Sequence, residues 1–422
     1  MTPAERRPQR FATVLAVPAF RCFFIGQMVS QFGDRLVPVA LAFAVLRATG
    51  SAADLSLVLV SGALAQLACL LPGGVLADRW PRRAVMAGCD LAQFAVTGAV
   101  LTFLVAAPPT AVAGRPLVVV LAGAAAAQGA AAAVFQPAAA GLIPSLVPAA
   151  RLADANALSQ VGTAATRVAG LAAAGLLAAA AGPDGRQGPA WTFAIDAATF
   201  AVSALSLALI RPTPSPARRR PGWRTDLRDG WAAFRGCRWI LVATPALLLA
   251  DFAFAIFVVL GPLACLRYYH GAVTWSAVSA AGAAGAVAGG LATARFRPRH
   301  PLPGALAAGA CFALPAVALA ARLPVAAVAG LSAVGETGLL VFTRLYLTAI
   351  QQAFAPEVLS RVSSFGLTGS AAVYPLGLAC AAPLAATISV GPALGLAGLA
   401  LAASMLGPLL APSVRSFEQS IE

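Results

Sequence analysis

The stretch GVLADRWPRR, at residues 74–83, contains one aspartate and three arginines and is flanked by two long apolar segments. The segments at 55–76 and 84–107 are each close to the roughly 20 residues that an α-helix needs to cross the hydrocarbon of a bilayer. We therefore expect residues 74–83 to form the short hydrophilic turn between two membrane-spanning helices.

The whole chain has the composition of a polytopic membrane protein. Of its 422 residues, 60% are hydrophobic and 10% are charged, and the mean hydropathy is +0.83. This composition excludes a soluble globular protein. The alternating pattern of an outer-membrane barrel is missing from the sequence, so the spans are expected to be helices.

Twelve spans are predicted, which gives an all-α membrane protein with two pseudo-symmetric six-helix bundles. The N-terminal half covers residues 1–210, a basic linker covers 211–238, the C-terminal half covers 239–411 and a tail covers 412–422. The linker is expected either as a helix lying on the inner leaflet or as a solvated connection. The predicted spans are 22–46, 55–77, 84–107, 117–139, 156–181, 190–210, 239–263, 275–294, 303–321, 325–350, 363–386 and 391–411.

The positive charge of the chain indicates its orientation in the membrane. All 29 basic residues are arginines, and the net charge is +14. Such a charge can indicate nucleic-acid binding, but these arginines fall in short loops, so no nucleic-acid partner is expected. With the N-terminus in the cytoplasm, loop arginines lie inside rather than outside by about four to one, which places both termini in the cytoplasm.

Enzymatic chemistry is not expected. The seven cysteines are scattered without C-x-x-C spacing, and both histidines, His270 and His300, lie in predicted loops. This pattern favours neither a disulfide framework nor a metal site. A Walker sequence and lysine itself are missing, so ATP hydrolysis by this chain is excluded. We expect no cofactor.

The two halves show signs of an internal repeat. Gly74 recurs as Gly290, before a second apolar-to-basic turn, and Asp34 recurs as Asp251 at nearly the same offset. Two equivalent six-helix halves are the arrangement expected of an alternating-access transporter.

The pattern Gly74-x-x-x-Asp78-Arg79-x-x-Arg82-Arg83 resembles the loop signature of the major facilitator superfamily, which lies between spans 2 and 3. Further stretches are similar to those of bacterial exporters of macrolides, tetracycline and the siderophore enterobactin. These stretches are SQFGD at 30–34, FQP at 135–137, LVP at 146–148, ANAL at 155–158 and IDAATF at 195–200. The resemblance covers about residues 15–411 and implies the bacterial inner membrane.

The sequence departs from the family pattern at two positions. Pro81 stands where the loop signature has its second glycine, and it fixes the backbone there. In span 5, Leu171 stands where many proton-driven antiporters of the family have the proline of a Gly-Pro pair. The second departure weakens the inference of proton antiport.

The resemblance implies that the loop signature is a gate. In the family, this loop latches the two halves in the outward-open state, and Asp78 would be the central residue of the latch. An acid is favoured near a helix N-terminus and accepts charge-assisted hydrogen bonds. The alternative is that Arg79, Arg82 and Arg83 anchor the loop on the cytoplasmic side.

Three acids near the middle of spans are candidates for coupling or substrate binding. Asp34, Asp251 and Glu336 lie in spans 1, 7 and 10, which line the central cavity in this family. A charge at this depth is costly, so such a residue faces a cavity or a partner. The alternative for each acid is a structural hydrogen bond or ion pair.

Other polar residues complete the predicted site. We assign Gln31, Gln136 and Arg344 to the coupling or substrate cavity, and Arg35 and Arg167 to charge pairing within the membrane. Asp90 and Asp196 lie nearer to the ends of their spans and are interpreted as structural.

The predicted function is secondary active export of an amphiphilic small molecule, such as a drug, an antibiotic or a siderophore-like metabolite, by alternating access with proton antiport. Its partners would be the small-molecule substrate, protons and the lipid bilayer, and the chain would act as a monomer. Alternatives are a lysophospholipid or other lipid flippase, an importer of the same fold, and an uncoupled membrane sensor or scaffold.

Overall fold

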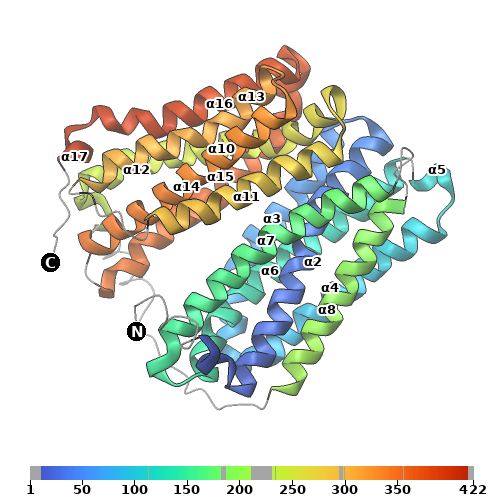
Figure 1. Ribbon diagram of the computed structural model, residues 1–422, viewed down its shortest axis with the longest axis horizontal. Helices are drawn as coiled ribbons and strands as arrows, with labels where there is room; N and C mark the ends of the chain where they lie inside the picture. Colours follow the sequence, from blue (N-terminus) through green and yellow to red (C-terminus); the bar gives the residue numbers. More distant parts are fainter. Residues whose placement is uncertain are drawn as a thin grey trace. The chain divides into compact units, whose positions relative to one another are not determined.

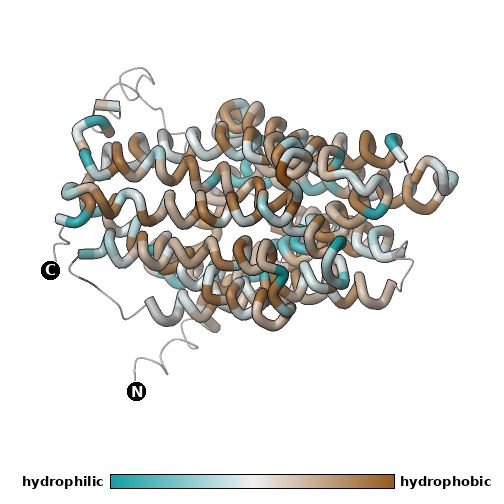
Figure 2. The backbone as a smooth tube through the Cα atoms, turned by 90° about the horizontal axis from the view of Figure 1, so that it is seen from above, coloured by the Kyte–Doolittle hydropathy of each residue, from teal (hydrophilic) through white to brown (hydrophobic). Residues whose placement is uncertain are grey.

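The structure is a computed structural model that describes residues 11–112, 114–181, 187–210, 231–232, 234–293, 298, 300–354 and 356–416, and all regular secondary structure in these ranges is helical. Twelve helices are long and apolar enough to cross a membrane, which confirms the predicted fold class. Hydrophobic residues are distributed along these helices (Figure 2). The helices group into two compact units, Met1–Arg218 and Arg219–Glu422.

The N-terminal unit contains six spanning helices (Figure 1). They are α2 (Pro18–Thr49), α3 (Ala52–Arg79), α4 (Arg82–Ala106), α6 (Arg115–Leu146), α7 (Leu152–Ala180) and α8 (Gln187–Leu209). The short helix α5 (Pro109–Val112) precedes α6. The first helix, α2, packs against the last two, α7 and α8, while α4 packs against α6 and α8, and α3 packs against α6. The two ends of the unit therefore meet along α2 and α8.

The C-terminal unit also has six spans, one of which is interrupted. The continuous helices are α10 (Arg238–Tyr268), α11 (Ala272–Thr293), α14 (Val325–Ala353), α15 (Pro356–Ile388) and α16 (Val390–Leu406), followed by the short α17 (Pro412–Arg415). The ninth span consists of α12 (Pro301–Ala310) and α13 (Leu314–Ala320), joined by a 3-10 turn at Cys311–Ala313. Pro315 explains this interruption, because a proline inside a helix lacks the N–H donor and clashes with the carbonyl four residues earlier.

The turn between α3 and α4 is much shorter than predicted. Helix α3 continues to Arg79 and α4 begins at Arg82, so only Trp80 and Pro81 separate the two helices. The expectation that residues 74–83 form a hydrophilic turn is therefore wrong for most of this stretch. Arginine is a good helix former, and Pro81, with φ −56°, is suited to the start of a helix, so the helices extend beyond their apolar parts.

Both units contain pairs of spanning helices in which backbone packs directly on backbone, and one pair from each unit serves as an example. In the α3–α6 pair, a Cβ atom on Gly129 would overlap the carbonyl group of Gly62. In the α11–α14 pair, a Cβ atom on Gly285 would overlap the backbone of Ala333. Small residues permit this close approach between membrane helices, where van der Waals packing is a main source of association.

The basic linker lies mostly outside the described residues. Trp231 and Phe234, at its C-terminal end, are helical and stack with their ring centroids 5.5 Å apart. Phe234 is 7% exposed and belongs to the hydrophobic core of the C-terminal unit. This end of the linker is thus packed against its own unit.

Candidate functional site

Asp34 lies on α2 with its side chain exposed on the N-terminal unit, and Gln31, one turn earlier, is half-buried. Gln136 of α6 is also exposed, and α6 packs against α2. Three residues predicted to belong to the coupling cavity therefore lie on adjacent helices. Since a carboxylate in a membrane span must reach water or a partner, the exposed position of Asp34 fits a group that is accessible from outside its own bundle.

Arg35, the neighbour of Asp34, lies between α2 and α7. Its side chain packs on Gly170 of α7, where a Cβ atom would be 2.6 Å from the Arg35 Cβ. The guanidinium is close enough to interact electrostatically with both Asp34 and Arg167. The structure thus brings together the two arginines that we assign to charge pairing, and it places Asp34 beside them.

Asp251 of α10 is half-buried and is bound by a neutral side chain. The hydroxyl of Ser370, on α15, donates a hydrogen bond of 2.5 Å to Asp251 Oδ2. Helices α10 and α15 pack along one another, so this bond joins two neighbouring spans. A carboxyl held by a hydroxyl can gain or lose a proton without breaking an ion pair.

Glu336 and Arg344 both lie on α14 but in different surroundings. Glu336 is half-buried against α11, where a Cβ atom on Gly282 would be 3.0 Å from Glu336 Cγ. Arg344 is exposed, and its Nη2 would lie 3.7 Å from a Cβ atom on Gly290. Asp251 faces α15 and Glu336 faces α11, so the two predicted acids of this unit have different neighbours.

The arginines of the loop signature bind the ends of neighbouring helices. Arg82 donates a hydrogen bond to the carbonyl oxygen of Gly141 in α6. Arg83 donates to the carbonyl oxygens of Ala208 and Ile210, at the C-terminal end of α8. At the end of α8, the last carbonyls lack intrahelical partners and a nearby cation is favourable. Gly141 lies a little more than one turn before the end of α6. Within the N-terminal unit, these two arginines therefore fasten the start of α4 to α6 and α8.

The remaining residues of the signature have other surroundings. Arg79 is exposed, and a Cβ atom on Gly74 would meet open space. The side chain of Asp78 lies outside the described part of the structure. The gating role of Asp78 stays a prediction.

Removing the anchoring arginines should destabilise the N-terminal unit. The double variant Arg82→Ala/Arg83→Ala leaves carbonyl groups of α6 and α8 without their donors, and each lost bond should cost on the order of 1 kcal/mol at this partly exposed site. We expect a lower midpoint of thermal unfolding in detergent. Arg79→Ala is the matched control and should leave the midpoint unchanged. Equal midpoints for the wild type and the double variant would contradict the anchoring role.

Two acids that were interpreted as structural lie in a buried polar interface. Asp90 of α4 is 2% exposed and Asp196 of α8 is 0% exposed. Asp196 lies near the middle of its helix rather than near an end, because α8 begins at residue 187. Asp34 is close enough to interact electrostatically with both acids. The sequence contains a signal for this interface, since polar residues on α8 recur at 196, 199, 203 and 206, at the three- and four-residue intervals of one helix face.

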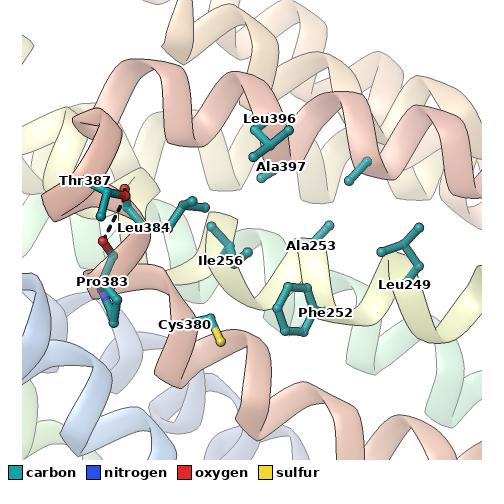
Figure 3. A pocket seen from close by; sticks show the side chains of 11 residues that line it. Leu249, Phe252, Ala253, Ile256, Cys380, Pro383, Leu384, Thr387, Leu396 and Ala397 are labelled. Carbon is teal, nitrogen blue, oxygen red and sulfur yellow. Dashed lines mark hydrogen bonds between the residues drawn. The ribbon is translucent and has the colours of Figure 1, made fainter.

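An apolar pocket lies between α10, α15 and α16 (Figure 3). Its volume is about 470 Å³, and its walls include Phe252 and Ile256 of α10, Leu384 of α15 and Leu396 of α16. At 100° per residue, Phe252 and Ile256 lie about 100° and about 140° around α10 from Asp251, on a different face of the helix. The pocket is therefore separate from the Asp251–Ser370 contact.

The fold and its membrane-embedded acids define a class of protein, the polytopic membrane transporters with two six-helix units. A family model described as the Major Facilitator Superfamily matches residues 23–378. The chain belongs to this superfamily, which indicates that it is a membrane transporter.

Solved structures of other transporters share the fold at low sequence identity. The nucleoside transporter NupG superimposes with a TM-score of 0.70 at 12% identity, covering 95% of this chain and 100% of that chain. A D-xylose-proton symporter gives a TM-score of 0.68 at 13% identity, covering 97% and 99%. A bacterial homologue of the human lysosomal transporter Spinster, in an inward-facing and unoccupied conformation, gives 0.64 at 17% identity, covering 94% and 95%. No curated protein sequence matches the chain.

Proposed function

We propose that this transporter exports an amphiphilic small molecule across the bacterial inner membrane by alternating access, in exchange for protons. The proposal takes its substrate class and direction from the resemblance of the sequence to bacterial exporters of drugs and siderophores. The assignment of the proton as the coupling ion rests on the acids within the spans.

The observation that carries the proposal is the hydrogen bond between Asp251 and Ser370. The carboxyl group lies in a spanning helix and is bound by a hydroxyl, which leaves it able to take up and release a proton. Asp34, its counterpart in the internal repeat, is exposed on the other unit. One titratable carboxyl group in each unit supports coupling of proton binding to the movement of both units.

Transport into everted inner-membrane vesicles tests this function. The protein would be expressed in a bacterial host that lacks its own major exporters, and the vesicles would be energised by respiration. Hoechst 33342, tetracycline, erythromycin and enterobactin serve as probes. We expect at least one probe to accumulate in vesicles that contain the protein, and a protonophore to abolish this accumulation.

Different outcomes separate the competing functions. Accumulation that persists with the protonophore would contradict proton coupling. Protein-dependent uptake by intact cells, with none in everted vesicles, would identify an importer. Movement of fluorescent lysophospholipid between leaflets, without transport of the four probes, would identify a lipid flippase.

A further inference from the structure

A stripe of buried polar side chains runs between α2, α4 and α8 in the N-terminal unit. We call it the polar stripe. Each member is at most 6% exposed, and on each helix the members share one face. The members are Gln27 of α2, Asp90, Gln93 and Thr97 of α4, and Asp196 and Ser203 of α8.

The two acids of the polar stripe are hydrogen-bonded in a crossed arrangement. Thr97 of α4 donates to Asp196 Oδ2 of α8 over 3.5 Å, and Ser203 of α8 is bonded to Asp90 of α4. Gln27 Nε2 of α2 donates to Ser203 Oγ over 3.4 Å. Each acid and the hydroxyl on its own helix are seven residues apart, or about 10 Å along the axis. The carboxyl groups therefore occupy two layers, and each layer supplies a neutral donor.

Each acid also has one oxygen without a hydrogen-bond partner. Asp90 Oδ2 and Asp196 Oδ1 are both fully buried and unpaired. An ionised carboxylate in such a place would need a cation or several donors, whereas a neutral carboxylic acid can stay buried at far lower cost. The environment therefore suits carboxyl groups that carry a proton.

Among the residues that the structure describes, the charged and titratable groups that act on the two acids are another acid and a thiol. Asp34 of α2 acts electrostatically on both, and Cys89 is adjacent to Asp90 on α4. Arg35 of α2 packs on Gly170 of α7 and interacts electrostatically with Asp34 and Arg167.

A small cavity lies beside Thr97, in the layer of the stripe that contains Asp196. Gln93 and Thr97 line it together with Gln128 of α6, and it has about 10 Å³ of space for the centre of a water molecule. That is close to the room that one water molecule needs, and a buried water needs two to four polar partners. The Thr97 hydroxyl, which here donates to Asp196, would lie between Asp196 and this water.

Helix α2 links the polar stripe to the exposed acid. Gly33 lies directly on Asp196 and Thr199, because a Cβ atom there would be 2.6 Å from Asp196 Oδ1 and would overlap the Thr199 hydroxyl. The next residue is Asp34. A shift of α2 therefore changes the surroundings of Asp34 and Asp196 together.

We propose that the polar stripe is a proton-holding site inside the N-terminal unit. In the conformation described here, Asp90 and Asp196 are carboxylic acids. Movement of α2 opens the cavity to bulk water. The Thr97 hydroxyl then turns to donate to the cavity water, accepts the proton of Asp196 and gives its own proton to that water, which releases it to bulk water. Asp196 is left as a carboxylate, and the reverse sequence restores the acid. This proposal deepens the proposed proton exchange and rests on it, since the protons held here would be those exchanged for substrate.

Infrared spectroscopy of the purified full-length protein tests the proposal without any transport substrate. Protonated carboxyl groups give a carbonyl band that shifts in D2O and is lost on ionisation. At neutral pH, the wild type should show this band, and Asp196→Asn and Asp90→Asn should each remove part of it. Asp154→Asn, at the start of α7, is the matched control and should leave the band intact. An identical band in the wild type and both stripe variants would overturn the proposal.

A second measurement on the wild type covers the case in which an amide variant fails to fold. Dicyclohexylcarbodiimide reacts with protonated carboxyl groups in apolar surroundings, and mass spectrometry locates the product. We expect modification of Asp196 or Asp90 and none of Asp154, and modification of neither stripe acid would count against the site. The carbonyl band should also be the same in sodium and choline chloride, and its loss in sodium would assign the stripe to Na⁺ instead.

The two proposals can fail separately. Proton-driven accumulation in vesicles without the infrared band would reject the polar stripe as a proton site but keep the exporter. If the infrared band is present but transport is not proton-driven, the proposed proton exchange is rejected. Asp90 and Asp196 would then be permanently neutral acids, and the proposed role of the stripe in exchange would be rejected as well.

Discussion

Asp251→Asn is expected to abolish proton-driven accumulation in everted vesicles while the protein still folds and inserts. An amide has nearly the same shape as the carboxyl group and still accepts a hydrogen bond from Ser370. It cannot bind and release a proton. We therefore expect the energised rate to fall at least about tenfold, which corresponds to about 1.4 kcal/mol of activation free energy.

The companion variants show whether the charge or the contact matters. Ser370→Ala removes the hydroxyl but keeps the acid, so it should retain transport that a protonophore abolishes. Asp34→Asn and Glu336→Gln should each reduce energised transport if they share the coupling. Full protonophore-sensitive transport in all three acid variants would eliminate proton coupling through these residues.

Gly285→Ala should cause a large loss of stability in the C-terminal unit. The added methyl group would overlap the carbonyl group and Cα of Ala333, and a backbone cannot move aside as a side chain can. Separation of α11 from α14 would also stretch the bond of 2.7 Å that the Thr337 hydroxyl donates to the Gly285 carbonyl. We expect a cost of about 3 kcal/mol, at the upper end for overpacking.

Thermal unfolding in detergent, followed by size-exclusion chromatography, measures this effect. Gly330→Ala is the matched control, because it lies on α14 and a Cβ atom there meets open space. Alanine has the higher helix propensity, so the control should match or exceed the wild type. A Gly285→Ala protein as stable as the wild type would show that α11 and α14 are not in backbone contact.

The number of spans could be predicted from the sequence, but the ends of the helices could not. Hydropathy identifies only the apolar residues that lie in the hydrocarbon of the bilayer. Helices such as α3 continue beyond these residues, through the charged residues Asp78 and Arg79. Pro315 does not by itself predict the break between α12 and α13, because prolines such as Pro38 and Pro72 lie inside unbroken helices of the same protein. Whether a proline breaks a helix depends on the partners that its neighbours find in the bundle.

The candidate site was predictable as a set of residues and not as a set of contacts. Depth in the membrane singles out Asp34, Asp251 and Glu336, since a charge there is costly. Nothing in the sequence pairs Asp251 with Ser370 or Arg83 with the end of α8, because these partners lie more than a hundred residues away. The position of Asp90 and of Asp196 in its own span does not predict their shared interface, because their surroundings are made by three helices.

The contact between α2 and α8 has a consequence for the biosynthesis of the protein. Spans enter the membrane in chain order, and α2 presents Gln27 and Gly33 to residues of α8, the last helix of its unit. The polar face of the first span therefore stays uncovered until the sixth has been made. Asp196 arrives on that sixth span, and a lone acid at this depth costs about 2.5–3.5 kcal/mol on insertion scales. Insertion of α8 and closure of the N-terminal unit should then be a single coupled step, completed only when six spans have left the ribosome.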